Sequence, residues 1–153
     1  MTTHSERLAE LGITLPAVAA PVAAYVPAVQ TGNQVWTSGQ LPFIAGELPA
    51  TGKVGIEVTA EEAADYARTA ALNALAAVDA LVGIDKITRV LKIVGFVSSA
   101  EGFTGQPAVI NGASNLIGEI FGEAGAHARS AVGVAELPLG APVEVELIVE
   151  VSE

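Results

Sequence analysis

Residues 127–151 read HARSAVGVAELPLGAPVEVELIVEV, a pattern that predicts two β-strands separated by the loop LPLGAP. Side chains alternate between the two faces of a strand. In the second strand, residues 143–151, the odd-numbered positions are apolar and three of the even-numbered ones are glutamates. In the first strand Arg129 shares a face with small residues. The pattern therefore predicts a sheet that buries one face, with a lone guanidinium in one of its strands.

The preceding sequence predicts the other elements of an α+β domain. Thr59 and Glu62 are spaced as a capping box at the start of a long Ala-rich helix that ends at Gly83. The other predicted elements are a short N-terminal helix (4–12), a hairpin (25–43) that turns at Thr31-Gly32-Asn33, a short strand (54–57), a β-branched strand (87–100) and a second helix (106–125).

This order of elements predicts one mostly antiparallel sheet with two helices on one face, in a single domain over residues 1–153 that includes an N-terminal helix and extension over residues 1–20. The other face of such a sheet stays open. The chain is 51% hydrophobic but only 5% aromatic, and its mean hydropathy is +0.52. We therefore expect a homo-oligomer, in which a second copy covers the open face.

Composition also excludes several classes of function. The formal net charge is −10, and the seven basic residues form no cluster, so nucleic acid is not an expected partner. Cysteine is absent, which fits a reducing cytoplasmic location. Prolines interrupt the uncharged residues 11–46, and the N-terminus lacks the features of a signal peptide, so we expect no membrane association. Two histidines and no paired ligand spacing predict no metal site.

Arg129 has two interpretations. If the two C-terminal strands pair through their loop, their polar faces coincide, and Arg129 shares a cleft with one of the glutamates. A lone arginine opposite a glutamate in a sheet is typical of a structural ion pair. The small neighbours of Arg129 also leave room for an external carboxylate, which a guanidinium binds bidentately. His127 lies on the same face, and its role stays open.

Three segments together resemble the Rid family of reactive-intermediate deaminases, also called YjgF-type proteins. They are AAYVPAVQTGNQVWTSGQLP (23–42), NALAAVDALVGIDKITRVLKIVGFV (73–97) and ARSAVGVAELPLGAPVEVELIVEV (128–151). The resemblance implies a chorismate-mutase-like homotrimer with clefts between adjacent subunits. It also implies cofactor-free hydrolysis of enamine or imine intermediates, released by pyridoxal-phosphate enzymes, to 2-oxo acids and ammonia. Some relatives are called endoribonucleases, but the acidic charge of this chain argues against RNA as substrate.

The resemblance also implies roles for individual residues. Arg129 matches the arginine that holds the substrate carboxylate, and Glu144, fifteen positions later, matches the glutamate that positions the attacking water. Ala131 stands where many members have cysteine, and its backbone remains available. The family asparagine of the second helix has Asn111, Ser114 and Asn115 as candidates. The expected site therefore comprises Arg129 and Glu144 as catalytic residues, with Tyr25, Ser38, Gly39, Ala131, Asn111 and Ser114 around the substrate.

Two functions remain open at this level. The first is a deaminase of 2-imino and enamine acids. The second is a non-catalytic trimer that binds a small carboxylate in the same clefts with Arg129 as its anchor. Both expect a homotrimer with a small carboxylate as partner and no cofactor.

Overall fold

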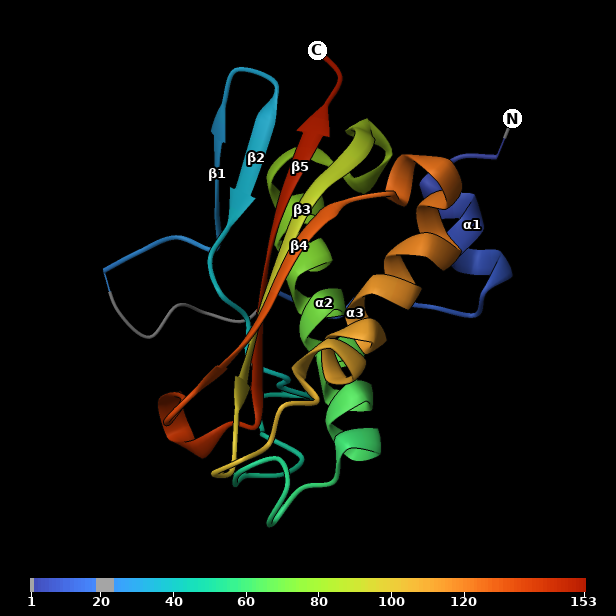
Figure 1. Ribbon diagram of the computed structural model, residues 1–153. Coiled ribbons are helices and arrows are strands. Elements are labelled where there is room, and N and C mark those ends of the chain that lie inside the picture. Colours follow the sequence, from blue (N-terminus) through green and yellow to red (C-terminus); the bar gives the residue numbers. More distant parts are fainter. Residues whose placement is uncertain (1, 19–23) are drawn as a thin grey trace.

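One five-stranded sheet with two helices on one of its faces organises the molecule, as Figure 1 shows. The computed structural model describes residues 2–18 and 24–153. Part of the Pro- and Ala-rich segment after the first helix therefore lies outside the described residues. The helices are α1 (His4–Glu10), α2 (Ala60–Val82) and α3 (Gln106–Phe121), and the strands are β1 (Ala28–Thr31), β2 (Gln34–Thr37), β3 (Ile87–Ser98), β4 (Ala128–Val134) and β5 (Val143–Val151).

The strand order in the sheet is β1-β2-β5-β3-β4. Neighbouring strands are antiparallel except for β3 and β4, which are parallel. This result confirms a single, mostly antiparallel sheet but corrects one detail, because β4 and β5 do not pair and β3 lies between them. The reason is the position of α3 in the chain. A helix between two strands serves as a crossover, which brings the second strand back parallel to the first.

The buried face of the sheet follows the predicted alternation. In β5 the apolar odd-numbered residues are buried, while the even-numbered positions are partly exposed. The predicted capping box begins α2, where Thr59 accepts a hydrogen bond from the Glu62 backbone N–H and the Glu62 carboxylate accepts one from Thr59, both at 3.1 Å. The helix ends at Gly83 as predicted. The core between helices and sheet consists mainly of Ala, Val, Leu and Ile.

Gly112 allows α2 and α3 to pack closely. A Cβ at this position would lie 1.9 Å from the Ala64 carbonyl oxygen of α2, which no side chain tolerates. A glycine inside a helix lowers helix propensity, and here it permits contact between the two helices. That contact fixes α3 over the sheet, and with it the polar residues that α3 carries.

The N-terminal helix α1 is attached to the far end of the same layer. The His4 imidazole is hydrogen-bonded to the Ile87 carbonyl at 2.7 Å, and the Ser5 backbone N–H and hydroxyl both donate to Asp85. These two hydrogen bonds lower the pKa of Asp85, the hydroxyl contributing more than the backbone. The predicted hairpin forms around Gly32 and Asn33.

The predicted short strand at 54–57 is wrong, because Val54 makes only isolated bridges, to Val58 and Ser99. Among the described residues, no helix has the length and apolar character to cross a membrane.

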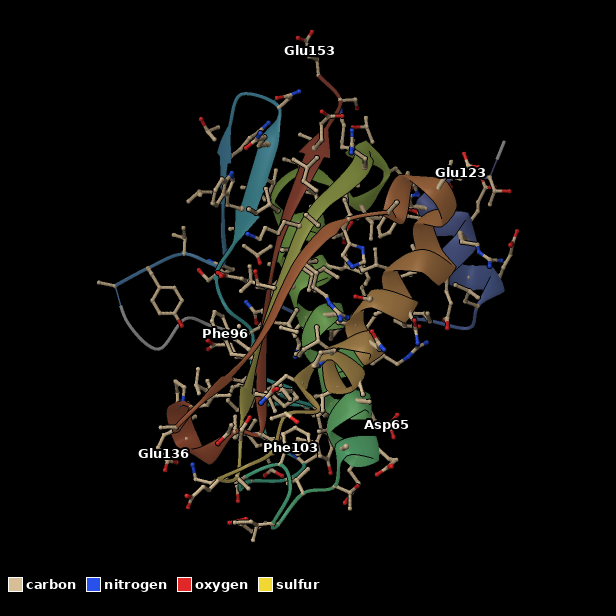
Figure 2. The ribbon with its side chains drawn as sticks, viewed as in Figure 1. Asp65, Phe96, Phe103, Glu123, Glu136 and Glu153 are labelled. Atoms are coloured by element: carbon tan, nitrogen blue, oxygen red, sulfur yellow. The ribbon has the colours of Figure 1, made fainter. Side chains whose placement is uncertain are left out.

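Within the part of the chain that the structure describes, no α-helix covers the opposite face of the sheet (Figure 1). Figure 2 shows Phe96 on this side, away from α2 and α3. Several large apolar side chains on it or at its edge are about half exposed, namely Val29 at 52%, Trp36 at 47% and Val132 at 44%. We call this surface, defined by Val29, Trp36, Phe96, Val132 and Ile148, the open face.

Candidate active site

Arg129 lies on the helix side of β4, where α3 covers it. Its register partner in β3 is Ile93, which is fully buried under the helices. Arg129 Nη1 donates to Asn111 Oδ1 at 2.7 Å and to Ser114 Oγ at 3.2 Å. Asn111 and Ser114 are one turn apart on α3, so both reach the same point of β4. Two of the three candidates for the family asparagine, Asn111 and Ser114, are therefore hydrogen-bonded to Arg129. The third, Asn115, is exposed and makes no contact of this kind.

No carboxylate lies within 4 Å of the Arg129 guanidinium among the residues that the structure describes. Both partners of Nη1 are neutral, so the positive charge of Arg129 is not compensated locally. Within the same residues, no acceptor contacts Nε or Nη2. These two atoms form one planar fork of donors, whose spacing matches the two oxygens of a carboxylate. The guanidinium is therefore held on one side and has donors to offer on the other.

His127, just before β4, and Ala131, within it, flank Arg129 along the chain. His127 Nε2 lies 2.9 Å from Ser114 Oγ, and Nδ1 lies 2.6 Å from the Gly125 carbonyl oxygen. His127 therefore contacts the Ser114 hydroxyl, which in turn contacts the Arg129 guanidinium. Ala131 lies beside Gly95 of β3 and packs against the edge of the core.

Glu144 lies at the start of β5 on the open face, where its register partner is Phe96. Gly39 lies against it, and a Cβ at Gly39 would be only 2.8 Å from Glu144 Cδ. Desolvation by this partial burial raises the pKa of the Glu144 carboxyl, and the nearby negative charge of Glu146 raises it further. A carboxylate in such surroundings is a stronger base than an ordinary surface glutamate.

Ser38 precedes Gly39 in the chain and is hydrogen-bonded to the segment that follows Tyr25. The Ser38 hydroxyl donates to the Val26 carbonyl at 2.6 Å, and its backbone N–H donates to the Pro27 carbonyl at 2.8 Å. Ser38 therefore fixes the segment that carries Tyr25, while its hydroxyl proton is already engaged. The Tyr25 side chain is exposed at 47%. Ser38, Gly39 and Glu144 thus make a second group, to which Tyr25 is connected through the Val26 carbonyl.

Arg129 and Glu144 do not share a cleft within one chain, which corrects the prediction from the strand pattern. Arg129 aligns with Ile93 on the helix side of β3, whereas Glu144 aligns with Phe96 on the open side. The prediction failed because it paired β4 with β5 directly. With β3 between them, the two polar positions fall on opposite faces of the sheet. The predicted site residues therefore form two separate groups, Arg129 with Asn111, Ser114 and Ala131, and Glu144 with Gly39 and Ser38. Tyr25 belongs to the segment that Ser38 holds.

Sequence reasoning did not reach two features of these groups. The hydrogen bonds that join Ser114 to His127 and to Arg129 depend on how α3 lies over β4. The only signal for them is the spacing of Asn111 and Ser114, which places both on one face of the helix. The hydrogen bond from Ser38 to Val26 spans the base of the hairpin, and no motif marks it.

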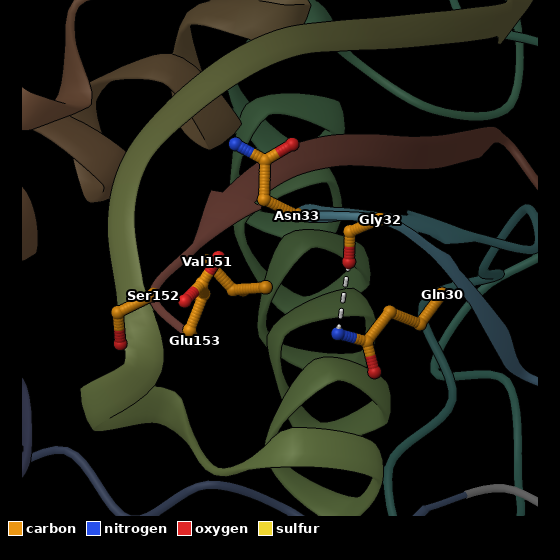
Figure 3. A pocket seen from close by; sticks show the side chains of 6 residues that line it. All are labelled: Gln30, Gly32, Asn33, Val151, Ser152 and Glu153. Atoms are coloured by element: carbon orange, nitrogen blue, oxygen red, sulfur yellow. Dashed lines mark hydrogen bonds between the residues drawn. The ribbon is translucent and has the colours of Figure 1, made fainter.

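A hollow of about 530 Å³ lies elsewhere, between the tip of the β1–β2 hairpin and the C-terminal residues (Figure 3). Its lining includes Gln30, Asn33 and Glu153, and it contains neither Arg129 nor Glu144. The Gln30 amide is hydrogen-bonded to the Gly32 carbonyl within the hairpin. No group of three or more His, Cys, Asp or Glu side chains suited to a metal ion occurs within residues 2–18 and 24–153.

Fold and site together define a small α+β protein with a mixed sheet, two covering helices and a guanidinium free to bind an anion. The model of the family described as "YjgF/chorismate_mutase-like, putative endoribonuclease" matches residues 5–151. The chain is 47% identical over 147 residues to Protein TCP17 of Trypanosoma cruzi, covering 95% of this chain and 92% of that protein. It is 33% identical over 141 residues to a 2-iminobutanoate/2-iminopropanoate deaminase of Dermatophagoides farinae, covering 92% and 95%.

A solved structure shares the whole fold. It is Atu1372 of Agrobacterium tumefaciens, described as a protein of unknown function, with a TM-score of 0.89 and 48% identity. The alignment covers 97% of this chain and 92% of Atu1372. The chain therefore belongs to the YjgF, or Rid, family, and its single mixed sheet with helices agrees with the YjgF/chorismate-mutase-like fold.

Proposed function

We propose that the protein hydrolyses 2-imino acids and their enamine tautomers to 2-oxo acids and ammonia, at a site shared by two subunits of a homotrimer. The observation that carries this proposal is the state of Arg129. Its guanidinium is fixed by two neutral groups of α3, and the Nε and Nη2 donors remain available on its other side.

Arg129 binds the substrate carboxylate. Two parallel N–H···O bonds orient a planar acid group better than a single ammonium does. In a 2-imino acid the reactive C=N carbon is bonded directly to the carboxylate carbon. A fixed carboxylate therefore also fixes the electrophile, and this orientation is a large part of the rate enhancement.

Glu144 activates the attacking water. Burial and Glu146 raise the pKa of its carboxyl, which makes the carboxylate a more effective proton acceptor. Water adds to the imine carbon, the C=N π electrons go to nitrogen, and the water proton passes to Glu144. The protonated carboxyl returns this proton to nitrogen, which gives a carbinolamine. The Glu144 carboxylate then takes the proton of the carbinolamine hydroxyl and passes it to nitrogen, so that the C=O bond forms, the C–N bond breaks and ammonia leaves. The step transfers no electrons to or from an external group.

A shared site follows from the opposite positions of the two groups. One chain has Arg129 on the helix side of its β4 edge and Glu144 on its open face, so a productive site needs Arg129 of one chain and Glu144 of another. The half-exposed apolar side chains of the open face favour such an assembly. Tyr25 then forms part of the wall opposite Arg129. The deaminase of Dermatophagoides farinae supports the reaction class.

The direct test uses an L-amino-acid oxidase to generate a 2-imino acid, with semicarbazide as the trap. The wild-type protein should lower the rate of semicarbazone formation by hydrolysing the imine first. Arg129→Ala should abolish this effect because the substrate carboxylate loses its binding partner. Arg68→Ala is the matched control, since it removes one arginine and a single surface ion pair to Glu119 on the helix layer.

Two results contradict the proposal. If Arg129→Ala retains the wild-type effect, Arg129 does not bind the substrate. The second result is that the wild type, like the variants, leaves semicarbazone formation unchanged, although calorimetry shows that 2-oxobutyrate binds to it. The protein is then a non-catalytic carboxylate-binding trimer.

A further inference from the structure

Ser114 and His127 lie behind Arg129, and the proposed reaction does not use them. We infer that they form a positioning relay of two hydrogen bonds. His127 accepts a hydrogen bond from the Ser114 hydroxyl, and Ser114 Oγ accepts one from Arg129 and so fixes the guanidinium. The nature of the bound carboxylate rests on the proposed function. The relay itself is a property of the protein without ligand.

The direction of each hydrogen bond follows from its partners. A carbonyl oxygen only accepts, so the contact of 2.6 Å between His127 Nδ1 and the Gly125 carbonyl requires a proton on Nδ1. In the neutral ring Nε2 then carries no proton and accepts from the Ser114 hydroxyl at 2.9 Å. The Ser114 proton is thus directed at His127, and a lone pair of its oxygen faces Arg129 Nη1 at 3.2 Å.

His127 fixes the orientation of the Ser114 hydroxyl, whose oxygen can only accept from the guanidinium. A serine hydroxyl rotates freely between donating and accepting unless a neighbour fixes it. Both hydrogens of Nη1 have acceptors only while the Ser114 oxygen lone pair faces Arg129, the second acceptor being Asn111 Oδ1. These two anchors set the plane of the guanidinium, and hence the direction of the fork formed by Nε and Nη2.

The backbone fixes His127 in turn. The residue lies between the 3-10 turn η2 (Gly122–Gly125) and the start of β4, and its Nδ1–H donates to the last residue of that turn. The imidazole therefore cannot rotate toward Arg129 without losing this bond. Its position suits a positioning residue, because its ring contacts Ser114 rather than the Arg129 guanidinium.

Two substitutions separate the two hydrogen bonds of His127. The asparagine side chain places its amide nitrogen near the Nδ1 position, so His127→Asn keeps the donor to Gly125 but removes the acceptor for Ser114. The glutamine side chain places its amide near the Nε2 position, so His127→Gln keeps an acceptor for Ser114 and loses the donor to Gly125. A purely structural role at the turn predicts the opposite ranking.

The first measurement is the mobility of the Arg129 side chain, by ¹⁵N relaxation at Nε in the full-length protein without ligand. The relay predicts a lower order parameter in His127→Asn and in Ser114→Ala, and a value near wild type in His127→Gln. The second measurement is the Kd of 2-oxobutyrate by calorimetry. We expect it to rise about fivefold in His127→Asn and Ser114→Ala, as for the loss of one neutral hydrogen bond. In the Ser114→Ala background, His127→Asn should add nothing.

The outcomes distinguish the relay from the reaction. If His127→Asn behaves as wild type and His127→Gln does not, the Gly125 bond is the one that matters and the relay is wrong. Unchanged Arg129 mobility in every variant also overturns it. If the mobility ranking is as expected but the wild type shows no imine hydrolysis, the relay is supported and the proposed reaction fails.

Discussion

Arg129 and Glu144 depend on opposite kinds of surroundings. The positive charge of Arg129 has no local counter-charge among the described residues, because its partners in α3 are an amide and a hydroxyl rather than a carboxylate. Glu144 is half-buried beside Gly39, and its pKa is raised because burial disfavours the carboxylate. If the two side chains were paired in one chain, each would neutralise the other, and the pKa of Glu144 would be lowered instead. Within one chain the two side chains lie on opposite faces of the sheet and form no such pair.

The role of Glu144 predicts a pH dependence and a specific loss. Only the ionised carboxyl accepts a proton, so kcat of the wild type should fall as pH falls through the Glu144 pKa. Because that pKa is raised, the midpoint should lie above the ordinary glutamate value. Glu144→Gln should lower kcat at neutral pH by about 100-fold or more, with a smaller change in KM, since general base catalysis contributes roughly that much. Initial rates of ammonia release measure both.

A stability control accompanies this variant. A carboxyl whose pKa is raised on folding is destabilising while it is ionised, that is, at pH values above its folded pKa. Glu144→Gln should therefore unfold at neutral pH at the same temperature as wild type or a higher one. A lower unfolding temperature, or a kcat within a factor of about three of wild type, would contradict the assigned role.

At the level of elements, the sequence predicted what depends on neighbours in the chain. The capping box of α2, its end at Gly83, and the alternation of β5 all follow from residues a few positions apart. The pairing of β4 did not follow, because the loop before β5 suggested a direct hairpin. The crossover through α3 decides the pairing instead. The same error put the predicted position of Arg129 on the face that carries the glutamates, whereas it lies on the helix side. The candidates Asn111 and Ser114 lie where expected, because their position depends only on the spacing of residues along one helix.

The contact between α2 and α3 predicts opposite effects for two glycines of α3. Gly112→Ala places a Cβ 1.9 Å from the Ala64 carbonyl oxygen, so the helices must separate. We expect a loss of about 2 kcal/mol in the free energy of unfolding, because overpacking outweighs the gain in helix propensity. Gly118→Ala is the matched control, since its Cβ meets no atom within 4 Å. That variant should gain up to about 1 kcal/mol. Denaturant unfolding measures both, and a neutral or stabilising Gly112→Ala would contradict the close contact.

At the scale of the whole molecule, two features of a single chain are incomplete. β4 is an edge strand, paired within the described residues to β3 alone. The open face also presents Val29, Trp36 and Val132 about half exposed. An unpaired strand edge can pair with another chain, and a large exposed apolar face marks an interaction surface. The two polar groups of the proposed site lie beside these surfaces, Arg129 on β4 and Glu144 on the open face. Assembly and catalysis are therefore proposed to depend on the same contacts.

This dependence predicts that two inactive variants restore each other. Arg129→Ala and Glu144→Gln, unfolded together in equal amounts and refolded as mixed trimers, should regain about one quarter of wild-type activity, because each site draws its arginine from one chain and its glutamate from another. Each variant refolded alone should stay inactive, and light scattering should give the same trimer mass for every sample.

The control experiment mixes the double variant Arg129→Ala/Glu144→Gln with the Arg68→Ala control. An intact shared site in this mixture requires that both of its chains be control chains. If both residues act within one chain, the first mixture stays inactive and the second retains about half of the activity. That result would contradict a site shared between subunits, whereas about one quarter in both mixtures is the result expected of a shared one.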